Sequence, residues 1–283
     1  MAKNPLIKPY LKWAGGKRQL LPEIKRQMPA CIRADTYYEP FVGAGALLFD
    51  VQPPKAVIND LNTQLILTYR VIREQVDELI EILKKHQENN SKEYFYRIRS
   101  LDRDEEAFQR LSDVEKAARL IFLNKTCYNG LYRVNSQGLF NVPYGRYRRP
   151  AICEEPVLRA DSTYLTQAEI TIRNGDFADA VRDADAHSFV YFDPPYHSPN
   201  RTNFTGYQAE GFGEREQTRL RDVFAALTDC GAKCLLSNSD TPWIRGLYAD
   251  PRFVLLPVQA KRAINSNSAG RGSVGELLIK NWK

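Results

Sequence analysis

The stretch that most constrains the fold is 188–196, SFVYFDPPY, in which an apolar run ends in an acid, two prolines and a tyrosine. The apolar run predicts a buried strand, which must stop there because prolines have no backbone N–H with which to continue a sheet ladder. The acid and the tyrosine ring are therefore presented at the carboxyl end of the strand. Ligands bind at that end in open α/β sheets, so this stretch predicts an α/β fold with a site beyond the strand.

A second strand, turn and helix are predicted at 36–50, TYYEPFVGAGALLFD. Gly43 and Gly45 let the backbone turn sharply and approach a bound group, and the free N–H groups of the helix start favour negative charge. Asp60 ends the next strand, AVIND, where a carboxylate can accept both hydroxyls of a ribose. Leu48 stands where a dinucleotide fingerprint needs a third small residue, which disfavours NAD. Together these residues predict a nucleoside-type cofactor site, and a turn that serves packing alone is the alternative.

Residues 10–17, YLKWAGGK, place an aromatic ring and two lysines around a Gly-Gly turn, ahead of a predicted helix at 20–28. A phosphate-binding P-loop is excluded, because Leu11 stands where that motif requires a glycine and Arg18 stands where a Ser or Thr must follow Lys17. Taken by themselves, these residues favour a surface loop that leads into the helix.

The middle of the chain contains three segments of different character. Residues 61–86 repeat apolar side chains at intervals of three and four, which predicts a helical contribution to the core. Residues 88–110 are dense in charges of both signs and predict a solvated face or helical connection without specific chemistry. Residues 116–149 hold no Asp or Glu, so the formal net charge of +6 is concentrated there. The basic residues of this segment are Lys116, Arg119, Lys125, Arg133, Arg146, Arg148 and Arg149.

Within the basic segment, residues 127–147, CYNGLYRVNSQGLFNVPYGRY, interleave aromatic residues with Asn-Gly and Gln-Gly turn signals. This pattern predicts a hairpin with tyrosines and arginines near its tips. Basic side chains can contact phosphates, arginine can read guanine with two hydrogen bonds, and aromatic rings can fill gaps in a base stack. A basic surface hairpin without a partner is the alternative, but the absence of acids favours nucleic acid.

The pattern of a sheet resumes with a predicted strand at 170–174, which is followed by Asp176 and Phe177. Asp176 can accept from a purine amino group while Phe177 covers the ring, although an aspartate at a helix N-cap is the commoner explanation. A helix is predicted at 214–228, a strand at 233–237, and a closing hairpin at 253–258 and 276–282. The linker of that hairpin, 259–273, contains no acid and carries Lys261, Arg262 and Arg271.

Composition excludes several other classes of protein. The five cysteines form no Cys-x-x-Cys pair and only three histidines accompany them, which predicts a reduced protein that binds no metal. No apolar run approaches the roughly 20 residues that span a bilayer, and the first residues contain no uninterrupted apolar core of signal-peptide length. We therefore expect a cytoplasmic protein that does not bind membranes.

Taken in order, WAGGK, EPFVGAGAL, IND, GDF and DPPY resemble the Dam-type DNA adenine N6-methyltransferases, including restriction-modification methyltransferases that protect GATC. The resemblance runs from about residue 10 to residue 282 and includes the hairpin and the stretches FTGY and LLSNSD. It implies an α/β, Rossmann-like, S-adenosylmethionine-dependent methyltransferase domain with a mixed sheet, formed by 1–60 and 160–283. It also implies a smaller target-recognition domain of helices and a β-hairpin, formed by 61–159.

The resemblance implies roles for individual residues. Trp13 and Lys17 belong to the first S-adenosyl-L-methionine motif, Asp60 holds the ribose, and Asp176 and Phe177 lie near the cofactor's adenine. The loop under the methionine part comprises 39–45, with Glu39, Phe41, Gly43 and Gly45. The catalytic motif comprises Asp193, Pro194, Pro195 and Tyr196, of which Asp193 also belongs to the cofactor-binding set. The expected DNA-binding residues are Tyr128, Asn129, Leu131, Arg133, Asn135, Pro143, Arg146 and Arg148; among them Arg133 is implied to read guanine.

The reaction can be argued from chemistry alone. The amino nitrogen of adenine is a poor nucleophile because its lone pair is delocalised into the ring. Asp193 and the carbonyl of Pro194 can accept its N–H groups, so that the nitrogen attacks the methyl group in line without a covalent enzyme intermediate. The base must leave the duplex to be reached, and Tyr196 offers it a stacking face. Methylation of a cytosine ring carbon is disfavoured, because no cysteine here follows a proline.

The family resemblance also implies the substrate, the second product and the oligomeric state. We expect double-stranded DNA as the substrate, S-adenosyl-L-homocysteine as the second product, and a monomer or weak dimer. The resemblance leaves open whether a cognate restriction endonuclease accompanies the enzyme and acts separately. Two rival functions remain at this point: methylation of an RNA base or a protein side-chain amide, and DNA binding by a protein whose cofactor fold has become structural.

Overall fold

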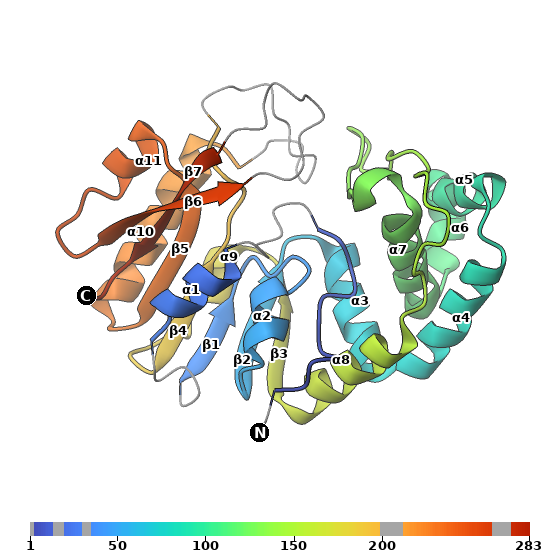
Figure 1. The fold of residues 1–283 in the computed structure, drawn as a ribbon, viewed down its shortest axis with the longest axis horizontal. Helices are drawn as coiled ribbons and strands as arrows, with labels where there is room; N and C mark the ends of the chain where they lie inside the picture. The colour runs from blue at the N-terminus through green and yellow to red at the C-terminus, as the bar shows by residue number, and fades with distance from the viewer. Residues whose placement is uncertain (1–2, 14–19, 30–34, 199–211, 262–272) are drawn as a thin grey trace. The chain divides into compact units, whose positions relative to one another are not determined.

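The computed structural model describes residues 3–13, 20–29, 35–198, 212–261 and 273–283 (Figure 1). It has a mixed α/β fold with a seven-stranded sheet of strand order β3-β2-β1-β4-β5-β7-β6, which confirms the predicted fold class. The strands are β1 (Thr36–Glu39), β2 (Lys55–Asp60), β3 (Glu169–Asn174), β4 (Ser188–Phe192), β5 (Lys233–Ser239), β6 (Val254–Lys261) and β7 (Ser273–Lys280).

The described helices alternate with these strands or lie between β2 and β3. The α-helices are α1 (Leu21–Gln27), α2 (Ala46–Val51), α3 (Thr63–Glu74), α4 (Val76–Glu88), α5 (Lys92–Ser100), α6 (Glu105–Arg110), α7 (Asp113–Thr126), α8 (Glu155–Gln167), α9 (Phe177–Ala180), α10 (Glu214–Asp229) and α11 (Pro242–Leu247). Two short 3₁₀ turns are η2 (Leu101–Arg103) and η3 (Tyr128–Gly130).

Strand β4 confirms the buried strand predicted at the start of the stretch 188–196. All five of its residues are buried, because it pairs in parallel with β1 on one side and with β5 on the other. Its last residue, Phe192, pairs with Leu236, and Asp193 follows directly. The two prolines thus begin one residue beyond the end of the ladder, as their missing N–H groups require.

The mixed character of the sheet comes from the C-terminal strands. Strand β7 runs antiparallel to both β5 and β6, and Figure 1 shows β6 and β7 side by side. This confirms the predicted closing hairpin. Arg262 and Arg271 of its linker lie outside the described residues.

The chain divides into two compact units. The first comprises 1–16, 43–54 and 60–175, and the second comprises 17–42, 55–59 and 176–283. The segment predicted to recognise the target, 61–159, lies entirely within the first unit.

The core of the second unit forms around the strands β4 and β5. Helix α10 contacts β5, as Figure 1 shows. It buries Leu220, Phe224 and Leu227, which its helical periodicity places on one face. The ring of Phe224 lies 6.1 Å from that of Phe192 and 5.0 Å from that of Phe253. This packing fixes α10 relative to β4, the strand that residues 193–196 follow.

The first unit is mainly helical, and its core uses the stripe predicted at 61–86. The stripe forms two helices because the backbone leaves helical geometry at Gln75, which has φ −142° and ψ 43°. Leu65, Tyr69 and Ile72 on α3 and Leu79 on α4 are fully buried. Helix α7 contacts both α3 and α4.

The helical connection that was the alternative prediction for 88–110 forms as α5, η2 and α6, but the segment also contains a buried charge. Asp102 and Arg119 form a buried ion pair, with Nη2 of Arg119 2.8 Å from Oδ2 of Asp102. The same guanidinium donates to the carbonyls of Ile98 and Arg99. The sequence shows charges of both signs but not their partners, so one buried pair was hidden among exposed residues.

Removing the Asp102 carboxylate should destabilise the protein. We expect Asp102→Ala to lower the free energy of unfolding by about 3 to 5 kcal/mol, because the Arg119 guanidinium would stay buried without a counter-charge. Urea unfolding of the full chain measures the effect. Glu106→Ala is the matched control, because Glu106 pairs with Arg110 at the surface with a side chain 86% exposed, and we expect a change below about 0.5 kcal/mol. Equal losses in the two variants would contradict the assignment.

Candidate catalytic site and DNA-contacting hairpin

The carboxylate of Asp193 is oriented by the neighbouring strand. The hydroxyl of Ser237 on β5 donates to Oδ1 of Asp193 at 3.0 Å, and the hydroxyl of Tyr191 on β4 lies 3.0 Å from the same Ser237 oxygen. Both Tyr191 and Ser237 are buried, whereas Asp193 is half-buried. Asp193, at the carboxyl end of β4, is therefore oriented by the buried hydroxyl of Ser237.

The ring of Tyr196 is anchored at its far end. Its hydroxyl donates to Oε2 of Glu276 on β7 at 2.8 Å. Burial and the nearby Asp193 carboxylate raise the pKa of Tyr196 well above its ordinary value, so it remains a neutral phenol that can donate this bond. The predicted catalytic residues thus depend on Ser237 and Glu276, which we did not single out from the sequence because their partners are distant along the chain.

Candidate cofactor residues of the first unit surround the glycine turn. Gly43 and Gly45 have φ of +51° and +71°, in the left-handed region that favours glycine. Asp60 accepts from the backbone N–H of Gly43 at 3.1 Å and of Asn62 at 2.9 Å. Burial raises the pKa of this carboxyl, and the two amides oppose that shift. The glycine turn and the acid, predicted separately, are joined by a hydrogen bond.

The indole of Trp13 belongs to the same part of the first unit. A Cβ on Gly43 would lie 3.0 Å from Cδ1 of Trp13, so the indole closely covers the glycine. Trp13 also stacks on Tyr132, with ring centroids 5.1 Å apart. Tyr132 is an aromatic of the hairpin that we did not single out, although its type and position could have drawn attention to it. Lys17, the other residue of this predicted motif, lies outside the described residues.

Candidate cofactor residues of the second unit lie at or just after the ends of β1 and β3. Glu39 is buried and accepts from the hydroxyl of Tyr37 at 2.6 Å. Phe41 stacks on Phe177 with centroids 5.3 Å apart. Phe177 itself is only 5% exposed, so most of its ring already contacts protein.

Asp176 has the capping role that we gave as the commoner explanation, and a second role as well. Its side chain accepts from the N–H of Ala178 at the start of α9. It also pairs with both terminal nitrogens of Arg219, at 3.0 and 2.5 Å, and the guanidinium lies 4.3 Å from the centre of the Phe177 ring. The Arg219 guanidinium holds the pKa of Asp176 below its usual range. Arg219 was missed because nothing in the helix sequence links it to this turn.

These donor sets fit S-adenosyl-L-methionine chemically. Asp60 supplies a carboxylate acceptor of the kind that ribose hydroxyls need, at the end of a strand and beside a glycine turn. Glu39 supplies a second carboxylate, and Phe41 supplies an apolar ring of the kind that can contact a purine.

The hairpin predicted at 127–147 forms as two antiparallel bridges, Cys127 with Tyr144 and Val134 with Phe140, and not as continuous strands. The reason is that side chains occupy its backbone groups. Phe140 donates its N–H to Asp102, and Arg103 and Arg99 donate to the carbonyls of Phe140 and Val142. The charged segment 88–110 therefore anchors the hairpin, a function that the sequence did not reveal.

Most of the residues expected to contact DNA are exposed on this hairpin. Leu131 and Asn135 are half-buried, and the Oδ1 of Asn135 accepts from the N–H groups of Gln137 and Leu139 within the turn. Arg133 is exposed, and its Nε donates to Oδ1 of Asn141 at 2.7 Å. The exposed members of the predicted set are Tyr128, Asn129, Arg133, Pro143, Arg146 and Arg148.

Two members of the basic segment are not part of an exposed surface. Arg119 is buried in the pair with Asp102, and Lys125 is largely buried against Glu154 at 2.5 Å. The exposed positive surface of this segment is therefore smaller than its seven basic residues would give if all were exposed.

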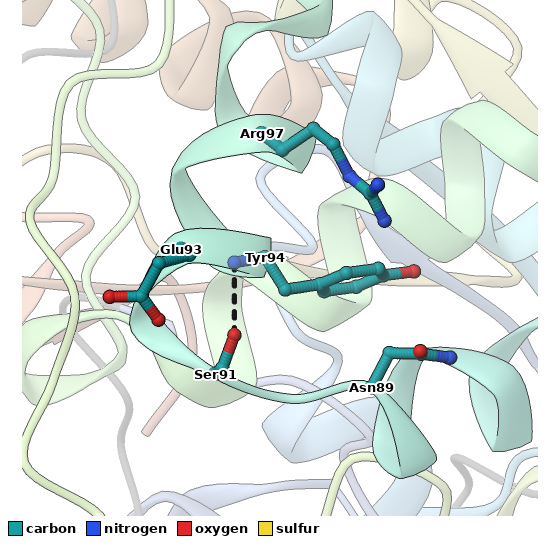
Figure 2. Close-up of a pocket in the computed structure, with 5 residues that line it drawn as sticks. All are labelled: Asn89, Ser91, Glu93, Tyr94 and Arg97. Carbon is teal, nitrogen blue, oxygen red and sulfur yellow. Dashed lines mark hydrogen bonds between the residues drawn. The ribbon is translucent and has the colours of Figure 1, made fainter.

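Other possible sites carry no assigned role. Figure 2 shows a pocket lined by Asn89, Ser91, Glu93, Tyr94 and Arg97, in which the Arg97 guanidinium lies 4.8 Å from the centre of the Tyr94 ring. Within the described ranges, no group of three or more His, Cys, Asp or Glu residues could hold a metal ion. No helix of that part of the chain is long and apolar enough to cross a membrane.

Comparison with known proteins gives one consistent result. Residues 13–264 match the family model described as D12 class N6 adenine-specific DNA methyltransferase. The chain is 44% identical to a protein of Lactococcus lactis subsp. cremoris named Type II methyltransferase M1.LlaDCHI, over 100% of this chain and 98% of the relative. It is 34% identical to the DNA adenine methylase of Escherichia coli strain K12, over 98% of this chain and 95% of the relative.

The glycine turn offers a sharp stability test. We expect Gly45→Ala to lower the free energy of unfolding by about 2 to 4 kcal/mol, because the new Cβ would strain a positive φ and lie 2.7 Å from the hydroxyl of Tyr69. That hydroxyl would be pushed from the carbonyl of Gly43, to which it donates at 2.9 Å.

Gly138→Ala is the matched control for this test. Gly138 also has a positive φ, +76°, but a Cβ there meets no atom within 4 Å, so urea unfolding should show a loss of only about 1 kcal/mol. A loss at Gly45 no larger than that at Gly138 would refute the close packing of the turn.

Proposed function

The chain belongs to the D12 class of N6 adenine-specific DNA methyltransferases, and we propose that it methylates adenine in duplex GATC with S-adenosyl-L-methionine as the donor. The observation that carries the proposal is the acid at the end of β4, which is held by Ser237 and followed by two prolines and the anchored ring of Tyr196. When bound, S-adenosyl-L-methionine supplies an electrophilic methyl group on a sulfonium and leaves as S-adenosyl-L-homocysteine.

We assign the cofactor residues of each unit by their chemistry. Asp60 would accept the ribose hydroxyls, and Trp13 with Gly43 and Gly45 would bound the methionine part. Lys17 and Glu39 are proposed for the same methionine region by the family resemblance. Phe41 and Phe177 would form an apolar wall for the cofactor's adenine, with Asp176 beside it as an acceptor for the amino group.

The proposed reaction uses Asp193 and Pro194 as acceptors. Two N–H bonds directed at the Asp193 carboxylate and at the Pro194 carbonyl would draw electron density onto the amino nitrogen and favour its tetrahedral form. The carboxylate would also stabilise the positive charge that develops on that nitrogen and take up the proton that it loses. Direct transfer needs no covalent bond to the protein, so orientation and electrostatics would supply the rate.

Adenine must leave the duplex to reach these acceptors, and we propose that Tyr196 stacks on the extruded base. Tyr128, 49% exposed, is proposed to fill the vacated space together with Asn129. Arg133 would read guanine through its terminal nitrogens, while Asn141 holds its Nε. Exposed arginines of the hairpin, among them Arg146 and Arg148, would contact phosphates.

The choice of GATC rests on two supports. The hairpin sequence resembles that of GATC enzymes, and relatives that are 34% identical are named DNA adenine methylase. The 44% identical relative is named a Type II methyltransferase, which supports a restriction-modification role with a separate endonuclease. We further propose that the enzyme acts as a monomer or weak dimer in the cytoplasm.

The function is tested with methyl-labelled S-adenosyl-L-methionine and two duplexes that differ only in one GATC. We expect label in adenine of the GATC duplex and very little in the other. Label in adenine of both duplexes would refute the specificity, and label in neither would refute the proposed activity.

The role of Asp193 is tested by Asp193→Asn. We expect single-turnover transfer to fall by at least about 100-fold, because the amide keeps the shape but lacks the charge that stabilises the amino nitrogen. Thermal unfolding should stay close to that of the unchanged protein, since the side chain is half-buried. Turnover within about threefold of the original would remove Asp193 from the mechanism.

The role of Arg133 is tested by Arg133→Ala against Arg148→Ala. Loss of a guanine reader should reduce discrimination at one base pair by about 1 to 3 kcal/mol, measured as kcat/KM on GATC and singly substituted duplexes. Loss of a phosphate contact at Arg148 should weaken binding to every sequence alike and reduce its salt dependence. Uniform weakening in Arg133→Ala would recast that residue as a phosphate contact.

A further inference from the structure

Two buried amides lie behind the catalytic stretch, Gln217 on α10 and Asn238 on β5. Both side chains are 0% exposed, although neither is a residue type that favours full burial. Nε2 of Gln217 donates to the carbonyl of Pro195 at 2.8 Å, and Nδ2 of Asn238 donates to Oε1 of Gln217 at 2.9 Å. Oδ1 of Asn238 accepts from the N–H of His197 at 3.0 Å. This amide relay binds the backbone on both sides of Tyr196.

The direction of the relay is set at both ends. A carbonyl can only accept and a backbone N–H can only donate, so each amide has one orientation that satisfies its neighbours. Ser239 reinforces the far end, since its hydroxyl donates to the carbonyl of His197 at 2.7 Å and its N–H donates to Asn238. The relay is therefore a rigid connection between two packed elements and the chain that leaves β4.

The catalytic stretch needs such support because the sheet cannot provide it. The ladder between β4 and β5 ends at Phe192, and after Asp193 the next two peptide nitrogens, those of Pro194 and Pro195, carry no hydrogen. The orientation of these peptides must therefore be fixed through their carbonyls. Gln217 takes the carbonyl of Pro195, whereas among the described residues none donates to the carbonyl of Pro194. The carbonyl of Pro195 thus holds the backbone in place, and the carbonyl of Pro194 can accept a hydrogen bond from the substrate.

We propose that Gln217, supported by Asn238, is a positioning residue for methyl transfer. By holding the carbonyl of Pro195 it sets the direction of the Pro194 carbonyl and of the Tyr196 ring toward the adenine amino group. This inference rests on the proposed function of the Asp193–Tyr196 stretch. Gln217 touches neither substrate nor cofactor in this assignment, so its effect should fall on the rate of transfer and not on binding.

Single-turnover kinetics with saturating cofactor and GATC duplex test the assignment. We expect Gln217→Leu to slow transfer by roughly 100-fold, since misorientation of a reacting group by about 1 Å has that effect. The dissociation constants for S-adenosyl-L-methionine and DNA should change less than about threefold. Thr228→Val is the matched control, because it removes a hydroxyl that donates to the Phe224 carbonyl on the same helix, and it should leave the rate unchanged.

A second variant keeps the test valid if Gln217→Leu does not fold. In Gln217→Glu, a protonated carboxyl can still donate to Pro195 and accept from Asn238, whereas an ionised one cannot donate. Burial raises the pKa of such a carboxyl, so the rate relative to the unchanged protein should rise as pH falls from about 9 to about 6. The neighbouring Asp193, His197, Glu214 and Glu276 are present in both proteins, and the two proteins differ only in the carboxyl group at position 217.

Two results would overturn the proposal. One is a Gln217→Leu protein that folds and transfers methyl groups as fast as the unchanged protein. The other is a Gln217→Glu ratio that does not change with pH. Failure of the proposed function itself would look different, because the unchanged protein would then fail to label adenine.

Discussion

The central constraint in this protein is that its most buried strand ends at two prolines. Strand β4 is held on both sides only as far as Phe192, and after Asp193 the two prolines leave the backbone without an N–H group until Tyr196. Side chains from other elements must therefore hold the chain. Ser237 orients the acid, Glu276 anchors the ring, and Gln217 holds the carbonyl between them. The position of residues 193–196 therefore depends on the positions of β5, β7 and α10.

The aromatic core provides that placement. Phe192 and Phe224 pack together directly behind the strand end, and Leu236 on β5 belongs to the same buried cluster. Because this core fixes helix α10, the amide of Gln217 can be buried and still reach the backbone of the proposed catalytic stretch, 193–196. The same principle operates in the first unit, where the ion pair of Asp102 and Arg119 fixes the segment that anchors the hairpin. In both units, a packed interior positions groups on an irregular piece of chain.

Much of this could be predicted from sequence, because the relevant signals are local. An apolar run that ends in two prolines specifies a strand and its end, and a glycine turn followed by Asp60 specifies a second strand end. Long-range partners could not be predicted in this way. Nothing near Arg219 indicates that it pairs with Asp176, and the charges around Asp102 resemble those of an exposed helix. The hairpin was predicted from its turn signals, but its bridges are few because distant arginines occupy its carbonyls.

The claim that the acid at the end of β4 directs a methyl group to an adenine amino nitrogen can be measured directly. A GATC duplex with ¹⁵N at the amino position of adenine would be incubated with the protein and a ¹³C-methyl donor. The product nucleoside would then be examined by NMR. We expect a one-bond ¹³C–¹⁵N coupling in N6-methyladenine. A methyl group found on a ring atom of adenine or on a cytosine would contradict it.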